Sequence, residues 1–480
     1  MNNSKPKSNR SYNHSAPRKD FAKKPSTAPA KPQKFSNHVT RTKKLDIERI
    51  DSNFCGVAEV KGRIFHVKNV LLNERVEVEL PHLKDQAREK TYVYTPIRII
   101  TPSPDRVDVS CPYANDCGNC NLLHCKYTAQ LRDKAQRLNS TLNQIGVKSA
   151  KFIPSEQFTY RNKVPLAFTE VEKKTLVGFF NEETNRVVPV RRCQLHGAWF
   201  EKLVNVLNTW ATDNRLRAFK PWEQEGLLRF AVCRHLKGRI MVTIVARENI
   251  RCMDKLYSML DKEFKEVSLY LNINTQADSK VFSPKFIHYG GEKKLKGSIL
   301  AINILLSPNS FFQVNEQIAS EIYSKVLDYA ATDDTDTIVD AYSGIGITSL
   351  LFASKGKNVV SIEVVPQAVE DAKELAALNN LQSKIKHICG DCNNILPKLK
   401  VDGRTTFFVD PPRKGLGAKV CETIIKFKPA KIVYLSCNPE TLAEDLVRFK
   451  DGGYTVEEVT GYDMFPNTKH MESLVCLTRK

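Results

Sequence analysis

The pattern of apolar and polar residues changes character at about residue 297. Beyond it, apolar runs of strand length alternate with helical patterns that begin near residues 348 and 367. The expected strands are 337–341, 358–364, 385–389, 405–409 and 431–436. Strands that alternate with helices form a parallel sheet with ligands at the carboxyl ends of its strands. Residues 298–480 are therefore expected to form an α/β, doubly wound, Rossmann-like domain.

The region before residue 297 contains two further patterns. Residues 45–104 carry short runs with a period of two, including 56–60 and 63–67, which predict a small β-barrel of OB type. Such barrels often bind single-stranded nucleic acid. Residues 105–297 mix strand and helix signals, with one helical pattern over 127–145, and predict an α+β central domain. The chain is therefore expected to be a multidomain protein.

The first 44 residues have a composition of their own. Met1–Lys44 holds twelve Lys and Arg against the single acid Asp20, which is +11 of the formal charge of +20. With five prolines and few aliphatic residues, this segment cannot bury enough apolar surface to offset its ordering entropy. We expect a disordered basic arm that tethers the protein to RNA or DNA. A solubilising tail and an organellar transit peptide are the alternatives.

The whole chain has 73 Lys and Arg against 53 Asp and Glu, a balance that favours a polyanionic partner. Its apolar runs do not approach the roughly 20 residues of a membrane span. We expect a soluble, cytoplasmic protein without a membrane partner. Thirteen cysteines are too few for a disulfide scaffold, so most should be reduced thiols. They are dense only between Cys111 and Cys125.

The ends of the expected strands carry candidate chemistry. Gly344 and Gly346 follow the first strand, and Glu363 lies at the end of the second, where it could bind ribose hydroxyls. Because a third glycine in register is missing, this pattern fits S-adenosylmethionine better than a dinucleotide. Asp410, followed by two prolines, comes after a further strand and could fix a small acceptor group; a tight proline turn is the alternative.

The last strand ends at a cysteine. Cys437 would open into the ligand crevice, which favours a nucleophile over a buried core thiol. Near the C-terminus, His470 and Glu472 lie two residues apart on one side of what we expect to be an extended segment. Either side chain could accept a proton.

Five segments together resemble the RNA uracil-5-methyltransferase family: residues 307–315, 340–346, 410–415, 436–439 and 463–472. Residues 45–104 look like the TRAM domain of the ribosomal RNA members. The resemblance covers about residues 45–480 and leaves the basic arm outside.

The resemblance implies a mechanism and its residues. Cys437 would add to C6 of uracil, C5 would take the methyl group of S-adenosylmethionine, and Glu472 would remove the C5 proton. The target base would leave its stack. By the same resemblance, the methyl donor would be held by Gln313, Tyr342, Glu363 and Asp410.

The resemblance also implies a metal centre. Cys111, Cys117, Cys120 and Cys193 are similar to the four ligands of the family's [4Fe–4S] cluster, although Cys-Gly-Asn-Cys replaces the commoner Cys-Gly-Gly-Cys at 117–120. Zinc on four thiolates is the competing metal, and Cys125 could substitute for one ligand.

The expected substrate is a uridine of 23S ribosomal RNA, with transfer RNA as the alternative, and the expected state is a monomer. A non-catalytic RNA-binding assembly factor and an amino-methyltransferase of adenine or protein are the other function classes that the sequence leaves open.

Overall fold

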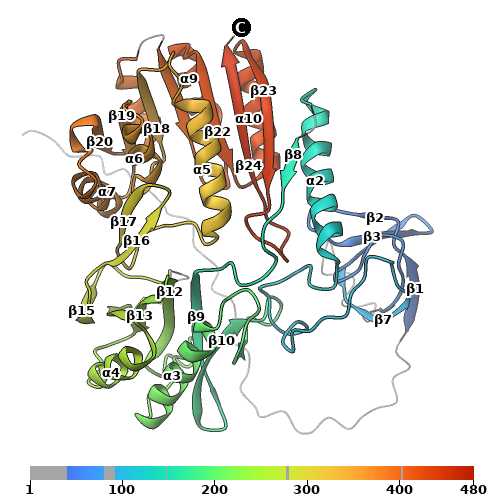
Figure 1. Cartoon of the computed structure of the whole chain (residues 1–480). Coiled ribbons are helices and arrows are strands. Elements are labelled where there is room, and N and C mark those ends of the chain that lie inside the picture. The colour runs from blue at the N-terminus through green and yellow to red at the C-terminus, as the bar shows by residue number, and fades with distance from the viewer. Residues whose placement is uncertain (1–40, 81–91, 149, 277–279, 402–403, 480) are drawn as a thin grey trace, which may run out of the picture. The chain divides into compact units, whose positions relative to one another are not determined.

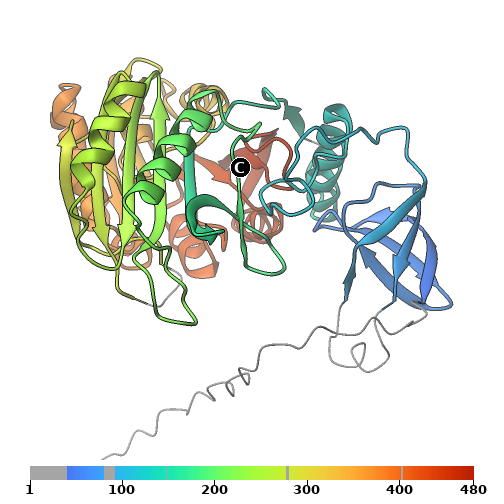
Figure 2. The same cartoon turned by 90° about the horizontal axis from the view of Figure 1, so that it is seen from below.

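The computed structural model describes residues 41–80, 92–148, 150–276, 280–401 and 404–479 (Figures 1 and 2). The expected basic arm lies almost entirely outside these residues, so its disorder stays a prediction. Within the described residues, no helix is long and apolar enough to cross a membrane.

The first part of the chain forms two small sheets. One has the order β1-β5-β7 and the other β2-β3-β4-β6. Their bounds are β1 (Thr42–Asp46), β2 (Arg49–Ile50), β3 (Gly56–Val60), β4 (Arg63–Val67), β5 (Arg75–Glu79), β6 (Val93–Tyr94) and β7 (Pro96–Thr101). Alternate residues of both sheets, such as Phe65, Val67, Val76 and Val78, bury into one shared core, as the period of two predicts. Its identity as a TRAM barrel stays a prediction.

A seven-stranded sheet follows, in the order β11-β10-β9-β12-β13-β14-β15. Its strands are β9 (Lys163–Val171), β10 (Lys174–Phe180), β11 (Val187–Pro189), β12 (Leu228–Leu236), β13 (Arg239–Ala246), β14 (Glu266–Ile273) and β15 (Phe286–Gly291). The helices α3 (Trp199–Asp213) and α4 (Met253–Glu263) lie side by side against it (Figure 2). Trp210 and its neighbours on α3 fill the core between helix and sheet.

The C-terminal region contains an eight-stranded sheet in the order β20-β19-β18-β21-β22-β24-β23-β8. Its strands are β8 (Lys151–Ile153), β18 (Thr337–Ala341), β19 (Asn358–Glu363), β20 (Ile385–Cys389), β21 (Thr405–Val409), β22 (Lys431–Ser436), β23 (Tyr454–Tyr462) and β24 (Glu472–Arg479). The five strands from β18 to β22 run parallel, which confirms the expected parallel sheet. β24 is antiparallel to both β22 and β23.

Helices cover both faces of this sheet. They are α2 (Tyr127–Gln144), α5 (Glu316–Ala330), α6 (Ile347–Ser354), α7 (Pro366–Leu378), α8 (Cys392–Ile395), α9 (Ala418–Phe427) and α10 (Pro439–Asp451), with 3₁₀ turns at Gln382–Lys384 and Leu396–Lys398. Neighbouring strand residues enter opposite cores: Phe408 packs with α5 and α6, whereas Phe407 packs with α9 and α10. This alternation is the sign of a doubly wound sheet.

Residues 127–153 differ from the sequence-based division of the chain. The sequence places them in the central domain, but β8 pairs in parallel with β23 and α2 packs against α10 (Figure 1). The physical reason is the edge of the sheet. The antiparallel pair β23–β24 leaves β23 with an unpaired side, and β8 covers it. Three residues of strand carry too weak a pattern to reveal this in the sequence.

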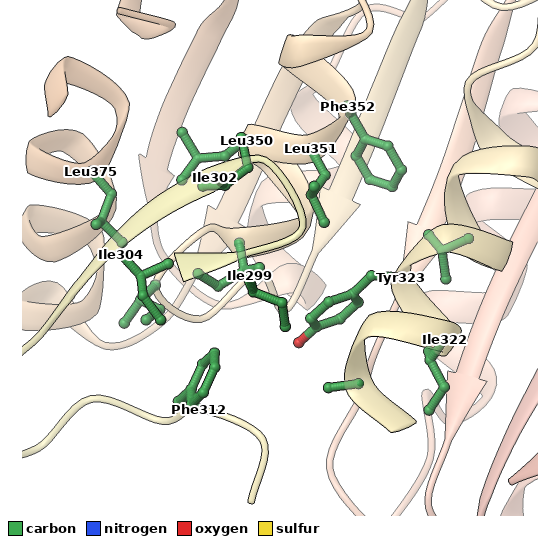
Figure 3. Packing of buried hydrophobic residues seen from close by; sticks show 14 of the residues in the cluster. Ile299, Ile302, Ile304, Phe312, Ile322, Tyr323, Leu350, Leu351, Phe352 and Leu375 are labelled. Atoms are coloured by element: carbon green, nitrogen blue, oxygen red, sulfur yellow. The ribbon is translucent and has the colours of Figure 1, made fainter. Parts of the chain in front are cut away.

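A hairpin positions the segment that carries Gln313. β16 (Leu295–Ile299) and β17 (Ile302–Leu306) form this hairpin. Ile302 and Ile304 belong to the buried cluster that includes Leu350 of α6 and Leu375 of α7 (Figure 3). Residues 307–315 therefore start from a firmly packed element.

Candidate active site

The carboxyl ends of the parallel strands bring four of the expected site residues to one edge. Tyr342 follows β18, Glu363 ends β19, Asp410 follows β21 and Cys437 follows β22. Since parallel strands end on the same side of a sheet, residues nearly 100 positions apart in the chain share this edge.

The loop after β18 has an unusual backbone. Tyr342, Gly344 and Gly346 have φ angles of 66°, 56° and 80°, in the left-handed region that glycine tolerates best. The Glu363 carboxylate accepts hydrogen bonds from the Gly344 N–H (3.0 Å) and the Val365 N–H (2.8 Å). Glu363 thus holds the glycine loop in place, and its carboxylate oxygens keep lone pairs that can accept further hydrogen bonds.

Gln313 is buried in a segment that is tied to α7. The hydroxyls of Ser307 and Ser310 donate to the two carboxylate oxygens of Asp371, at 2.9 and 3.0 Å. Asn162 Nδ2 donates to the Gln313 carbonyl oxygen at 3.1 Å. Because α7 follows directly after Glu363, these bonds fix the Gln313 segment relative to the strand ends that bear the other expected donor-binding residues.

Cys437 lies among acidic groups. Burial, together with the nearby Glu472 and Asp410, raises the pKa of the Cys437 thiol to about 11. Burial and Asp410 raise the pKa of Glu472 well above its usual range. The Arg413 guanidinium acts in the opposite direction on both pKa values. The free protein therefore holds a thiol, and Arg413 is the described neighbour that favours the thiolate.

Glu472 is the better proton acceptor of the two candidates. It is buried and opens β24, whereas His470 lies two residues before that strand, so the expectation of one shared extended segment stays a prediction. Burial and the adjacent Arg413 lower the pKa of His470 to about 4, which makes its imidazole a weak base. The raised pKa of Glu472 makes its carboxylate a stronger base than an ordinary one.

A second pair of acids lies behind the site. Asp340 is fully buried and accepts hydrogen bonds from the hydroxyls of Thr348 (2.7 Å) and Ser349 (2.5 Å). Burial raises the pKa of Asp340 to about 6. Burial and this neighbour together raise the pKa of Asp410 to about 7.

A pocket opens beside Cys437. Its lining includes Arg413, Lys469 and His470, together with Arg137 from α2. Arg137 forms an ion pair with Glu440, with N–O distances of 2.8 and 3.1 Å. Cationic side chains around this strand-end thiol suit a ligand that carries phosphates. Arg137 could not be identified from the sequence, because a single arginine in a polar helix gives no signal of its distant partner.

The four cysteines of the expected metal centre line a different pocket. Cys111, Cys117, Cys120 and Cys193 all contribute to its wall, alongside apolar residues such as Leu123 and Phe179. Burial raises the pKa of Cys120 and Cys193, and the other thiols of the group add to the effect. Cys125 lies elsewhere, where it donates to the Lys126 carbonyl oxygen and lines another pocket. A substitution by Cys125 would therefore need rearrangement of the loop.

No site for a single metal ion is recognised at the four thiols, which all lie within the described residues. Among the described residues, no group of three or more His, Cys, Asp or Glu side chains is placed to hold a single metal ion. A zinc ion needs its sulfur ligands at about 2.3 Å. The four thiols share one pocket, and the metal centre expected there stays a prediction.

Comparison with known proteins places the chain in a family. Residues 397–480 match the family model for tRNA (Uracil-5-)-methyltransferase, and residues 324–406 match the model for the TRM5/TYW2 methyltransferase domain. The first of these spans contains Asp410, Cys437 and Glu472.

The chain is also similar to whole proteins. It is 33% identical over 448 residues to an uncharacterized RNA methyltransferase of Halalkalibacterium halodurans, covering 91% of this chain and 96% of that protein. It is 34% identical over 447 residues to one from Caldanaerobacter subterraneus subsp. tengcongensis, covering 91% and 97%. Among solved structures, Pyrococcus abyssi tRNA (uracil-54, C5)-methyltransferase in complex with S-adenosyl-L-homocysteine has a TM-score of 0.75 and 26% identity, covering 91% of this chain and 99% of that one. The chain belongs to the RNA uracil-5-methyltransferase family and is an S-adenosylmethionine-dependent RNA methyltransferase.

Proposed function

We propose that the protein methylates C5 of a uridine in 23S ribosomal RNA through a covalent bond between Cys437 and C6 of the base. The observation that carries this proposal is the pairing of β22 with β24. Ser436 pairs with Ser473 in antiparallel register, so the next residue outward on each strand is Cys437 and Glu472. A nucleophile and a proton acceptor thus meet at the ligand edge of the sheet.

The chemistry follows from the two side chains. The Cys437 thiol first loses its proton to solvent. The thiolate sulfur then forms a bond to C6, and the electron pair of the C5–C6 double bond shifts to form an enolate, which makes C5 nucleophilic. Bound S-adenosylmethionine supplies an electrophilic methyl group to C5. Glu472 then takes the C5 proton, the C5–C6 double bond re-forms, and the C–S bond breaks to return the Cys437 thiolate.

The remaining expected residues have roles in holding ligands. We assign the methyl donor to the edge formed by Gln313, Tyr342, Glu363 and Asp410. The cationic pocket beside Cys437 would receive the phosphates that flank the target nucleotide, which must leave its stack to reach the thiol.

The cysteine pocket completes the proposal. Cys111, Cys117, Cys120 and Cys193 would hold a [4Fe–4S] cluster, because four thiols line one pocket and the thiol set is what such clusters bind. The uridine chemistry above needs no electron transfer, so we assign the cluster a structural role.

Transfer RNA is the second candidate substrate. The solved structure with a TM-score of 0.75 is a tRNA methyltransferase, and it covers nearly the same length. The proposal for ribosomal RNA rests instead on the β-rich region at 45–104 and the cysteine set.

A methyl-transfer assay with labelled S-adenosylmethionine tests both. Unmodified ribosomal and transfer RNA are incubated separately with the protein, and the nucleosides are then analysed. 5-Methyluridine in ribosomal RNA alone supports the proposal. The same product in transfer RNA alone supports the uridine C5 chemistry but contradicts the assignment of ribosomal RNA as the substrate. Methylated adenine contradicts the uridine chemistry. So does the absence of any methylated nucleoside when the protein has its proposed iron–sulfur cluster bound.

A further inference from the structure

The loop before Glu472 forms part of the site. We call residues 463–471, which join β23 to β24, the catalytic loop. Lys469, His470 and Met471 from this loop line the pocket beside Cys437, and Glu472 follows directly. Whatever fixes the path of this loop therefore also fixes the wall of the pocket and the first residue of β24.

Asn467 is the fully buried centre of the catalytic loop. Its side-chain oxygen accepts hydrogen bonds from Gln157 Nε2 at 2.8 Å and from Gln130 Nε2 at 3.2 Å. Its side-chain nitrogen donates to the Gln157 carbonyl oxygen at 2.9 Å, and its backbone N–H donates to Gln130 Oε1 at 3.0 Å. Asn467 also has a left-handed backbone, with φ at 64°. A buried residue with all its polar groups paired holds one geometry.

The carbonyl group of Asn467 reaches the cysteine segment. It accepts hydrogen bonds from the backbone N–H groups of Asn121 (3.0 Å) and Leu122 (3.1 Å). These two residues come directly after Cys120, which lines the four-cysteine pocket. Cys120 of that pocket is therefore the direct neighbour of Asn121, whose backbone N–H holds the catalytic loop.

Further bonds strengthen the same connection. The Tyr160 hydroxyl donates to the Pro466 carbonyl oxygen at 3.1 Å. Lys134 Nζ bonds to Asp463 Oδ1 at 2.6 Å, and both side chains are fully buried. The loop is thus held at its start and its middle by residues from the segment 121–160, more than 300 positions earlier in the chain.

We infer that Asn467 is a positioning residue that couples the segment after Cys120 to the catalytic loop, so that the position of Asn121 and Leu122 sets the placement of Glu472. The inference rests on the proposed role of Glu472 as the proton acceptor. Displacement of the segment after Cys120 would release Asn121 and Leu122, leave the Asn467 carbonyl group unpaired and allow the loop to move. The step that suffers is proton removal from C5, because Glu472 directly follows the loop.

The test uses the full chain purified with the proposed iron–sulfur cluster bound. Two variants are compared with the wild type. Asn467→Gly removes the side-chain bonds and keeps a residue that tolerates the left-handed backbone. Asn272→Ala is the matched control, since Asn272 is equally buried and its amide donates to the Ser283 and Lys285 carbonyl oxygens of the central sheet.

Two kinds of measurement follow. In single turnovers with substrate RNA, Asn467→Gly should slow release of the covalent adduct about tenfold. In steady-state assays, the KM for RNA should change less than about threefold. Asn272→Ala should match the wild type in both. In hydrogen–deuterium exchange without RNA, Asn467→Gly and Cys120→Ser should each speed exchange across residues 463–471.

Release at the wild-type rate in Asn467→Gly, or wild-type exchange of residues 463–471 in Cys120→Ser, would overturn the coupling. Failure of the proposed function is distinguishable. It would appear as a wild-type protein that forms no 5-methyluridine, while the exchange measurement still decides whether the cysteine pocket holds the catalytic loop.

Discussion

Cys437 and Glu472 are the outermost residues of two neighbouring antiparallel strands, one after the end of β22 and the other at the start of β24. They are 35 positions apart in the chain, yet the register Ser436–Ser473 sets them beside each other. The negative charge that Glu472 adds raises the pKa of the thiol. Under the proposed mechanism, the same proximity would let the carboxylate reach a base bonded to that thiol. The proximity of Glu472 thus destabilises the free Cys437 thiolate. In the proposed mechanism, it would favour the later transfer of the C5 proton to Glu472.

Substitution of Glu472 should stall the reaction after methyl transfer. In Glu472→Gln the amide cannot take the C5 proton, so we expect the RNA–protein adduct to accumulate and turnover to fall by about 10²–10⁴-fold. The adduct would be measured on a denaturing gel with natural substrate RNA. Glu457→Gln is the control, because Glu457 lies exposed on the adjacent β23 and accepts a bond from Thr478. Equal adduct levels in the two variants would contradict the assignment.

The reactivity of Cys437 should depend on pH with a predictable sign. Because the thiol pKa is about 11, its alkylation rate in the free protein should rise about tenfold per pH unit between pH 7 and 9. Glu472→Gln removes a negative neighbour and should lower this pKa, whereas Arg413→Ala removes a positive one and should raise it. Peptide mass spectrometry of alkylated Cys437 gives both rates. Shifts in the reverse directions would refute the electrostatic account.

The buried pair Lys134–Asp463 should matter for stability. In Lys134→Met, the Asp463 carboxylate stays buried without its cation, and we expect a loss of about 3–5 kcal/mol in the free energy of unfolding. The double variant with Asp463→Leu removes both charges and should lose less. Denaturant unfolding measures both values. A double variant that is less stable than the single one would show that the pair itself stabilises the fold.

The cysteine pocket should bind iron and not depend on Cys125. We expect iron and acid-labile sulfide in protein purified without oxygen, and their loss in Cys111→Ser or Cys193→Ser. Cys125→Ser is the matched control, because this thiol lies outside the pocket. Zinc in place of iron, or loss of metal in Cys125→Ser, would overturn the assignment of the four ligands.

The parallel core of the catalytic sheet could be predicted from sequence because its central strands β18, β21 and β22 are mostly apolar and buried, whereas β20 at the sheet edge carries a weaker pattern. The runs 337–341, 385–389, 405–409 and 431–436 match β18, β20, β21 and β22 to the residue. A strand buried on both faces leaves this strong signal, and the residues that follow it must lie at the ligand edge.

Other features were beyond the sequence for physical reasons. The placement of Glu472 depends on the antiparallel register of β24, which pairing across the sheet determines. β8 is too short to show a pattern, and its role comes from the free edge of β23. Arg137 and Asn467 act through partners more than 300 positions away, so no local pattern marks them.

The central claim is that Cys437 bonds to C6 of a uridine. RNA in which the target uridine is replaced by 5-fluorouridine tests it most directly, because Glu472 cannot remove fluorine as a cation and the adduct is trapped. With S-adenosylmethionine present, the account predicts an intact mass equal to protein plus RNA plus one methyl group, attached at Cys437 and absent in Cys437→Ala. An adduct at another residue, or a free methylated RNA with no adduct in the wild type, would contradict it.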